Sequence, residues 1–270
     1  MRDPNFVYTA NISIMFAERS FLERPRAAAA AGFQHIEMWW PFPTATADTH
    51  AVEQLLRAIA DAEVRLTCLN FFAGDMPSGE RGIANRPDRR SELQANTDQL
   101  VTIAERTGCQ LFNLLFGQRD ERWSPAEQDE AAVRAIREAA ADVRELGGTV
   151  LLEPLAVDLN GGYRLSTTQQ VIDLLAGKLA DVPNLALLFD VFHLGSNGAD
   201  IVRLARDVLP WIGHVQLADS PGRGEPGSGN LPIAESVAAL AAEGYRGLIG
   251  CEYKPTTRTE DSFGWIERTA

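Results

Sequence analysis

The chain has 270 residues, a net charge of −12 and an apolar fraction of 45%. The apolar fraction excludes an intrinsically disordered protein, and the negative charge argues against a broad surface for nucleic acid or anionic membranes. The chain is long enough for one large domain or two small ones.

The three cysteines are Cys68, Cys109 and Cys251. Their odd number and wide spacing exclude a disulfide framework and are typical of a reducing compartment. The N-terminal residues lack the apolar run of a signal peptide, and no segment reaches the ~18–20 apolar residues of a membrane span. We therefore expect a cytoplasmic protein with no membrane or nucleic-acid partner.

Short apolar segments alternate with helical patterns from one end of the chain to the other. Strands are expected at residues 7–13, 34–39, 65–70, 110–115, 149–153, 185–190, 212–217 and 248–252. Helices are expected at 20–31, 49–62, 89–107, 125–146, 167–180, 198–208, 231–243 and 259–268. The strands are rich in Val, Ile, Leu and Phe without strict alternation, which indicates burial on both faces. Eight such pairs predict a single-domain (β/α)8 TIM barrel over residues 1–270, with a doubly wound sheet as the alternative.

The helix expected at 125–146 carries the clearest signals. Ser124 and Pro125 form a typical start, and Gly147 and Gly148 supply the end. The longest loops, 71–88 and 218–230, both follow strands. In a barrel they would lie on the C-terminal face, where active sites are found.

Polar side chains end, or nearly end, the last four strands. They are Glu153, Asp190, Gln216 and Glu252. In a barrel these strands are neighbours, so the four side chains should converge. Three carboxylates this close resist ionisation unless a cation neutralises them, and an all-oxygen set suits a hard divalent ion. We therefore predict that these four residues bind Mg²⁺ or Mn²⁺.

Strand alternation supports this arrangement. An inward Glu252 places Cys251 toward the helices, an inward Asp190 does the same for Phe189, and His214 would lie inside below Gln216. Glu37 ends the second strand and is a weaker candidate, with His35 two residues before it.

Loop residues next to these strands are candidates for substrate binding. His193 follows Asp190 by three positions and could contact the metal or a substrate oxygen. Arg223 and Lys254 could bind a carboxylate, although each type of residue is also common as a solvated loop side chain. Trp39 and Trp40 could form an apolar wall of the pocket.

The segment 222–227 matches GxGxxG, but it lies near the C-terminus, contains Pro226 and does not open a helix after the first strand. These features argue against a dinucleotide site. We interpret the segment as an active-site loop.

The chain resembles the hydroxypyruvate isomerase family of xylose-isomerase-like TIM barrels. The motifs that carry the resemblance are ANISIMFAERSFLERPRAAAAAGFQHIE, FFAGDMPSGERGIA, LLEPL, LLFDVFH, HVQLADSPGRGEPG and GLIGCEYKP. The resemblance covers nearly the whole chain. It implies a divalent metal held by Glu153, Asp190, Gln216 and Glu252, an acid/base pair of Glu153 and Glu252, and substrate contacts from His193 and Arg223.

The implied reaction interconverts hydroxypyruvate and 2-hydroxy-3-oxopropanoate (tartronate semialdehyde) by metal-assisted proton transfer through an enediolate. The carboxylate of this small anionic substrate would bind Arg223 or Lys254. Two positions depart from the family pattern: Gly224 replaces a usual His, and Asn230 replaces a usual acidic residue. The loss of the His removes an expected substrate contact.

Other functions stay open. A 2-oxo-tetronate isomerase or a ketose 3-epimerase would use the same site, whereas a sugar-acid binding protein would not need facing glutamates. A metal-dependent endonuclease of this fold needs a His-rich site and a basic groove, and the chain has four histidines and a net charge of −12. Barrel helices often form dimers, so a homodimer is one expected assembly, although no residue specifies its interface.

Overall fold

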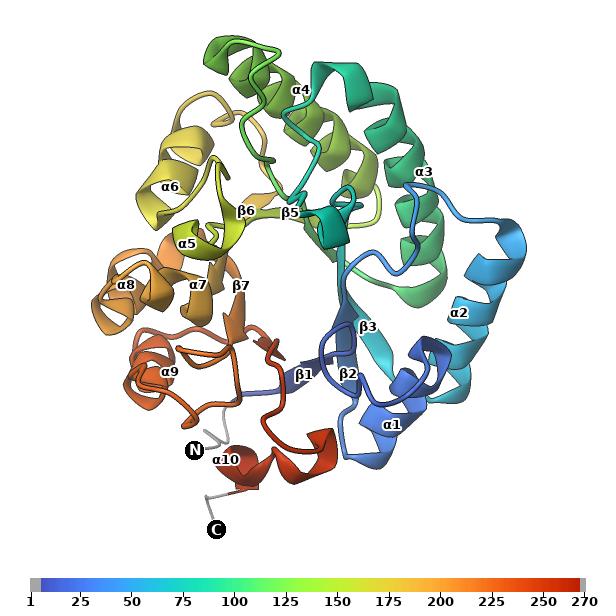
Figure 1. The fold of residues 1–270 in the computed structure, drawn as a ribbon, viewed down its shortest axis with the longest axis vertical. Coiled ribbons are helices and arrows are strands. Elements are labelled where there is room, and N and C mark those ends of the chain that lie inside the picture. Colours follow the sequence, from blue (N-terminus) through green and yellow to red (C-terminus); the bar gives the residue numbers. More distant parts are fainter. Residues whose placement is uncertain (1–5, 268–270) are drawn as a thin grey trace.

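Eight parallel strands form a closed barrel in the computed structural model, which describes residues 6–267. The strands are β1 (Tyr8–Asn11), β2 (His35–Met38), β3 (Arg65–Asn70), β4 (Leu111–Asn113), β5 (Thr149–Leu152), β6 (Leu185–Asp190), β7 (Ile212–Leu217) and β8 (Ile249–Cys251). They follow one another around the barrel in chain order, and β8 pairs with β1 to close it (Figure 1). The predicted (β/α)8 barrel is confirmed, and the doubly wound sheet is excluded.

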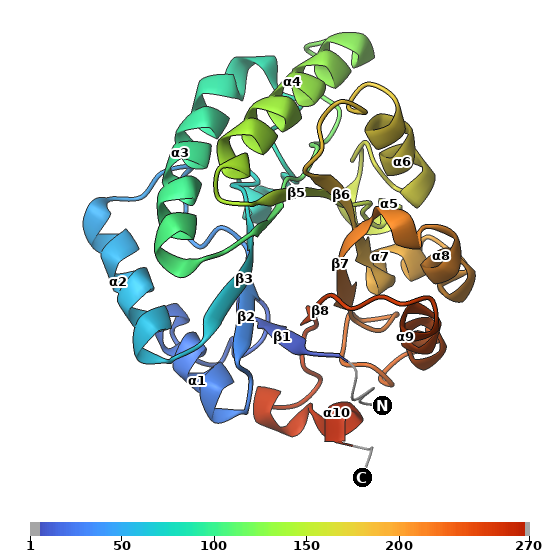
Figure 2. The same cartoon turned by 180° about the vertical axis from the view of Figure 1, so that it is seen from behind.

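The helices surround the barrel, as the view from behind also shows (Figure 2). The α-helices are α1 (Arg24–Ala30), α2 (Thr49–Asp61), α3 (Arg90–Thr107), α4 (Pro125–Arg144), α5 (Val157–Asn160), α6 (Thr168–Ala176), α7 (Val191–Ser196), α8 (Ile201–Asp207), α9 (Ile233–Ala242) and α10 (Gly264–Glu267). Short 3-10 helices span Phe21–Glu23, Met76–Ser78, Pro87–Arg89, Leu209–Trp211 and Thr259–Asp261.

The helix predictions are confirmed in place but not in every boundary. The segment expected at 167–180 ends as α6 at Ala176, and the one expected at 20–31 begins with a 3-10 turn. The segment expected at 259–268 is a 3-10 turn followed by α10, and its last residue lies outside the described residues. The helices α5 and α7 were not predicted, because each is too short to show a periodic apolar face.

The start of α4 shows how local sequence positions an element. The Ser124 hydroxyl accepts a hydrogen bond from the Glu127 N–H at 3.2 Å, and the Glu127 carboxylate accepts one from the Ser124 N–H at 2.8 Å. Pro125 occupies the first turn, where its missing N–H costs nothing. The predicted N-terminus of this helix is therefore confirmed.

The hydrophobic core has two parts. The larger part lies between the strands and the helices and includes Phe189 and Cys251, as strand alternation predicts. A small cluster of Cys68, Leu151 and Leu188 is packed separately from it. These three residues alternate with outward-facing neighbours, so the cluster fills the barrel interior below the site.

Among the described residues, every helix is too short or too polar to span a membrane.

Candidate active site

Each of the eight strands places a buried polar side chain at its C-terminal end. The residues are Asn11, Glu37, Asn70, Asn113, Glu153, Asp190, Gln216 and Glu252. Glu153 and Glu252 follow their strands by one residue. The sequence predicted the last four and ranked Glu37 lower, and the three asparagines were missed. The available signal was the same in every case: a polar residue at or next to the end of an apolar strand.

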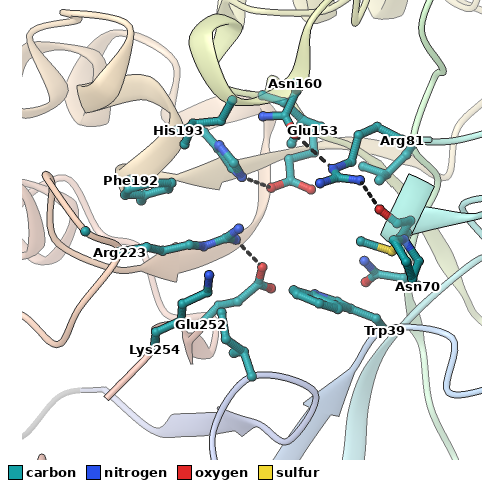
Figure 3. Close-up of a pocket in the computed structure, with 17 residues that line it drawn as sticks. Trp39, Asn70, Arg81, Glu153, Asn160, Phe192, His193, Arg223, Glu252 and Lys254 are labelled. Carbon is teal, nitrogen blue, oxygen red and sulfur yellow. Dashed lines mark hydrogen bonds and ion pairs between the residues drawn. The ribbon is translucent and has the colours of Figure 1, made fainter. Parts of the chain in front are cut away.

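A cavity of about 700 Å³ opens above this ring (Figure 3). The predicted site residues Glu153, His193, Arg223, Glu252 and Lys254 all line it. The structure thus brings together side chains that are 101 positions apart at the extremes, from Glu153 to Lys254. The volume of the cavity falls within the range of small-molecule sites.

Two further predicted residues, Asp190 and Gln216, are each 1% exposed and do not line the cavity. Trp39, one of the two tryptophans expected at the pocket, forms part of its wall, whereas Trp40 packs in the core.

Glu252 is surrounded by hydrogen-bond donors. Its Oε2 atom accepts from Asn11 Nδ2 at 2.7 Å and from Gln216 Nε2 at 2.6 Å, while its Oε1 atom forms an ion pair with Arg223. Burial raises the pKa of Glu252, and the charge of Arg223 opposes this rise. The three donors favour the ionised form of this carboxylate.

Glu153 has a different environment. It accepts one side-chain hydrogen bond, from Asn113 Nδ2 at 2.7 Å. Burial and the nearby Asp190 raise the pKa of Glu153 to about 8. Burial likewise raises the pKa of Asp190 to about 6, against the opposing charge of Arg223. Two such carboxylates can carry a proton near neutral pH, which is the property that general acid–base catalysis requires.

His193 is held in one orientation by the backbone. Its Nδ1 atom accepts a hydrogen bond from the Ala156 N–H at 3.1 Å. The neutral ring must then carry its proton on Nε2, which lies 3.7 Å from both Glu153 Oε1 and Asp190 Oδ2. His193 therefore presents a donor to the site.

Arg223 lies in the loop after β7 and faces two carboxylates. It contacts Glu252, and its Nη2 atom is 3.6 Å from Asp190 Oδ2. Its guanidinium lies 5.1 Å from the centre of the Phe192 ring. Arg223 adopts a φ of 60°, a left-handed conformation that costs energy for a residue with a side chain.

Asp219, which the sequence analysis missed, organises this loop. Its carboxylate accepts backbone hydrogen bonds from Ser220, Gly227 and Leu231 at 2.8–3.0 Å. The segment 222–227 is thus a loop at the cavity, as predicted, and not a helix start.

The two departures from the family pattern lie away from the cavity lining. A Cβ atom at Gly224 would lie 2.4 Å from Ser228 Oγ, so the loop is packed closely around this glycine. Asn230 is exposed. In this chain, position 224 does not line the cavity.

The site can accommodate a cation. A carboxylate oxygen of Glu153 and one of Asp190 lie within 4.8 Å of each other and of the His193 ring, which presents an N–H here and is not itself a ligand. Asp190 Oδ2 and Gln216 Oε1 are buried and accept no hydrogen bond from any described residue. Buried oxygen atoms without partners are costly, and a hard divalent ion would satisfy both. The donor set therefore fits a divalent metal.

Comparison with known proteins agrees with the barrel fold. Residues 25–269 match the xylose isomerase-like TIM barrel family. The hydroxypyruvate isomerase of Escherichia coli is 30% identical, over 96% of this chain and 98% of its own. A Streptomyces coelicolor protein that carries the same name provisionally is 39% identical, over 96% of this chain and 95% of its own.

The 2-oxo-tetronate isomerase of Cupriavidus necator is 33% identical, over 96% of this chain and 97% of its own. Among solved structures, a Brucella melitensis protein titled AP endonuclease, family 2 superposes with a TM-score of 0.86 at 31% identity, covering 96% of this chain and 97% of the other. The chain therefore belongs to the xylose isomerase-like TIM barrel family and, within it, to the hydroxypyruvate isomerases and their relatives.

Proposed function

We propose that the protein interconverts hydroxypyruvate and 2-hydroxy-3-oxopropanoate, with Glu153 and Glu252 as its acid/base pair. The observation that carries this proposal is that both glutamates, which directly follow β5 and β8, line one cavity (Figure 3) while remaining only 4% exposed. An isomerisation of this type needs a base at one carbon and an acid at its neighbour. The names of the relatives support this choice of substrate.

A divalent ion, Mg²⁺ or Mn²⁺, belongs to the proposal. The ion would be held by side-chain oxygen atoms of Glu153, Asp190, Gln216 and Glu252. The Nε2–H tautomer of His193 makes this ring a donor to substrate and not a ligand. When bound, the ion supplies Lewis-acid stabilisation of negative charge on substrate oxygens, worth several kcal/mol.

The side chains divide the proton transfers as follows. Glu252, whose carboxylate contacts three hydrogen-bond donors, takes the proton from the hydroxymethyl carbon of hydroxypyruvate. Glu153, across the cavity, delivers a proton to the adjacent carbon. The hydroxyl proton moves from the oxygen of the first carbon to the oxygen of the second, which leaves an aldehyde and a new hydroxyl group. His193 donates a hydrogen bond from Nε2 to a substrate oxygen, and the reverse reaction exchanges the roles of the glutamates.

The 2-oxo-tetronate isomerases are the second candidate group, because the cavity of about 700 Å³ has room for a four-carbon acid. A substrate panel separates the candidates. Purified protein should be assayed with hydroxypyruvate, 2-oxo-tetronate and ketoses, with and without a chelator. The proposal requires the highest kcat/KM for hydroxypyruvate, and a higher value for a ketose would contradict it.

Two other classes receive less support. An endonuclease needs a cationic groove and several metal-binding histidines, whereas the candidate metal group found among residues 6–267 contains one histidine. A sugar-acid binding protein gives no reason to bury two glutamates at one cavity. A small anionic substrate, a homodimeric assembly and a cytoplasmic location complete the proposal.

A further inference from the structure

Arg81 was not among the predicted site residues, yet it lines the cavity. It follows the 3-10 turn Met76–Ser78 in the long loop after β3, and it is half-buried. Its guanidinium points into the cavity from the side opposite Arg223 (Figure 3). The residue therefore presents a positive charge to any molecule bound between them.

The guanidinium is held by neutral acceptors only. Its Nε donates to Asn160 Oδ1 at 3.0 Å, and its Nη1 donates to the carbonyls of Met76 and Glu80 at 3.0 and 2.7 Å. Across the described chain, Arg81 forms no ion pair and its Nη2 group forms no hydrogen bond. The charge and one donor group thus remain available for a ligand.

The backbone around Arg81 is fixed by its neighbours. Its N–H donates to Gln118 Oε1 at 3.1 Å, and Gln118 Nε2 donates to the Gly79 carbonyl at 2.7 Å. The next residue, Gly82, has a φ of 100°, and a Cβ atom there would lie 2.2 Å from the Leu115 carbonyl oxygen. The loop is therefore pressed against the segment after β4.

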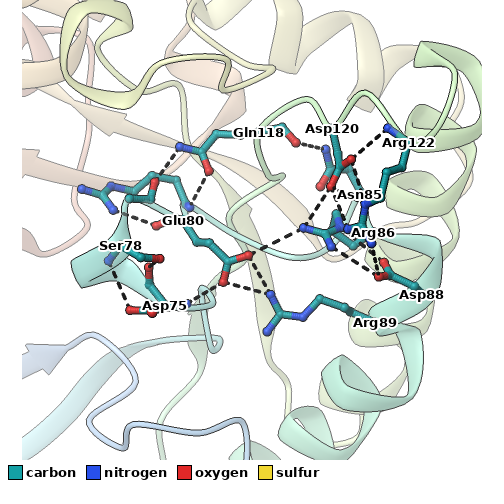
Figure 4. Close-up of polar contacts among 12 residues, drawn as sticks. Asp75, Ser78, Glu80, Asn85, Arg86, Asp88, Arg89, Gln118, Asp120 and Arg122 are labelled. Atoms are coloured by element: carbon teal, nitrogen blue, oxygen red, sulfur yellow. Dashed lines mark hydrogen bonds and ion pairs between the residues drawn. The ribbon is translucent and has the colours of Figure 1, made fainter.

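A charged network holds the same loop from its outer side (Figure 4). The Glu80 carboxylate accepts from the Asp75 N–H at 2.6 Å and from Arg89 Nη1 at 2.9 Å, and it lies 3.6 Å from Arg86. Arg86 and Arg89 are thus neutralised by carboxylates, whereas Arg81, in the same loop, is not. Such a network makes Arg81 a preorganised donor.

The other two cations at the cavity are less suited to hold a substrate carboxylate. Arg223 is already engaged by Glu252 and Asp190, and Lys254 is exposed. Burial and the facing charge of Arg223 lower the pKa of Arg81. An anion between the two arginines would offset this repulsion.

We propose that Arg81 binds the carboxylate of the substrate and thereby selects hydroxy and oxo acids over neutral sugars. Arg81 takes the role that the sequence analysis gave to Arg223 or Lys254. This inference rests on the proposed function, because it assumes that the anion of the reaction occupies the same cavity. The Nη2 donor and the fork geometry of a guanidinium suit a carboxylate.

The test compares D-glycerate with its neutral amide, D-glyceramide. Neither has the ketone or aldehyde group that the proposed isomerisation needs, so binding is measured without turnover. Titration calorimetry of the Mn²⁺-loaded protein should show a strong preference for glycerate, which Arg81→Gln reduces roughly 10–100-fold. Arg81→Lys should retain part of it. If Arg81→Gln only displaced the loop, the affinities for glycerate and glyceramide would fall equally and their ratio would not change. That result would overturn the inference.

Kinetics give an independent readout. Arg81→Gln should raise KM for hydroxypyruvate far more than it lowers kcat, and Lys254→Gln should change KM less than Arg81→Gln does. A larger effect of Lys254→Gln would transfer the role to Lys254. If the wild type binds glycerate through Arg81 but isomerises no hydroxy acid, the proposed function fails and the carboxylate site stands. If the wild type does not prefer glycerate, the carboxylate site fails.

Discussion

Glu37, together with Glu252, determines which way the Gln216 amide faces. Gln216 Nε2 donates to Glu37 Oε1 at 2.7 Å, and the amide oxygen, Oε1, is left buried without a hydrogen-bond partner. Glu37 Oε2 is also 2.7 Å from His214 Nε2, so His214 lies inside the barrel, as predicted, and holds the same carboxylate. Glu37, which the sequence ranked as a weaker candidate, thus helps to orient the oxygen of Gln216, a proposed metal ligand.

Replacing Glu37 should therefore weaken metal binding. In Glu37→Gln, an amide NH₂ group replaces one carboxylate oxygen. The side chain then has one acceptor left and cannot accept hydrogen bonds from both His214 and Gln216. We expect the free energy of unfolding to fall by about 1–3 kcal/mol and metal affinity to fall roughly 10–100-fold. Thermal unfolding and Mn²⁺ titration measure the two effects. Exposed Glu105→Gln is the control, and equal metal affinity in Glu37→Gln and this control would refute the role of Glu37.

Metal binding should release protons. In the metal-free protein the pKa of Glu153 is about 8 and that of Asp190 is about 6, so at pH 7 part of this pair is protonated. A carboxylate binds a cation more tightly when it is ionised, so affinity for Mn²⁺ should rise between pH 5 and about 8. Calorimetry in buffers of different ionisation enthalpy counts the protons released. A pH-independent affinity would show that these carboxylates are not ligands.

Chelation gives the complementary experiment. Protein treated with EDTA and dialysed should lose hydroxypyruvate isomerisation and regain it with Mg²⁺ or Mn²⁺, because several kcal/mol of charge stabilisation are then restored. Calcium, with its longer bonds and looser geometry, serves as the comparison ion. Undiminished turnover after verified metal removal would exclude a metal requirement.

The stability of the metal-free protein should depend on Glu153 in a pH-specific way. Its folded-state pKa of about 8 lies above its ordinary value of 4.5, so the folded state favours the protonated form. The cost of ionising the buried group is absent below pH 4.5 and complete above about 8. Metal-free Glu153→Gln should accordingly gain stability over wild type as pH rises across this window, by on the order of a few kcal/mol. A difference constant from pH 4.5 to 8 would contradict the assigned environment.

The sequence predicted those features that depend on local pattern. The eight strands, α4 with its Ser124 cap, and the convergence of strand-end residues such as Glu153 and Glu252 follow from periodicity and spacing. The asparagines at the mouth were missed because a single strand-end Asn is common in any protein. Their role becomes visible only in the closed barrel, where Asn11 donates a hydrogen bond to Glu252 and Asn113 donates one to Glu153.

Arg81 could not be identified from the sequence for a different reason. Nothing in the loop 71–88 distinguishes it from Arg86 or Arg89, which are close in sequence. The difference is tertiary: Arg86 and Arg89 form ion pairs with carboxylates, whereas Arg81 contacts only neutral acceptors among residues 6–267 and faces the cavity.

The measurement closest to the central claim is turnover of hydroxypyruvate by Glu153→Gln and Glu252→Gln, each loaded with Mn²⁺. NMR in D₂O would follow both product formation and deuterium entry at carbon. Wild type should form 2-hydroxy-3-oxopropanoate, and each variant should lose roughly 10²–10⁴-fold in kcat while keeping the thermal transition of a folded protein. Full turnover and deuterium exchange in either folded variant would remove that glutamate from the acid/base pair and contradict the account.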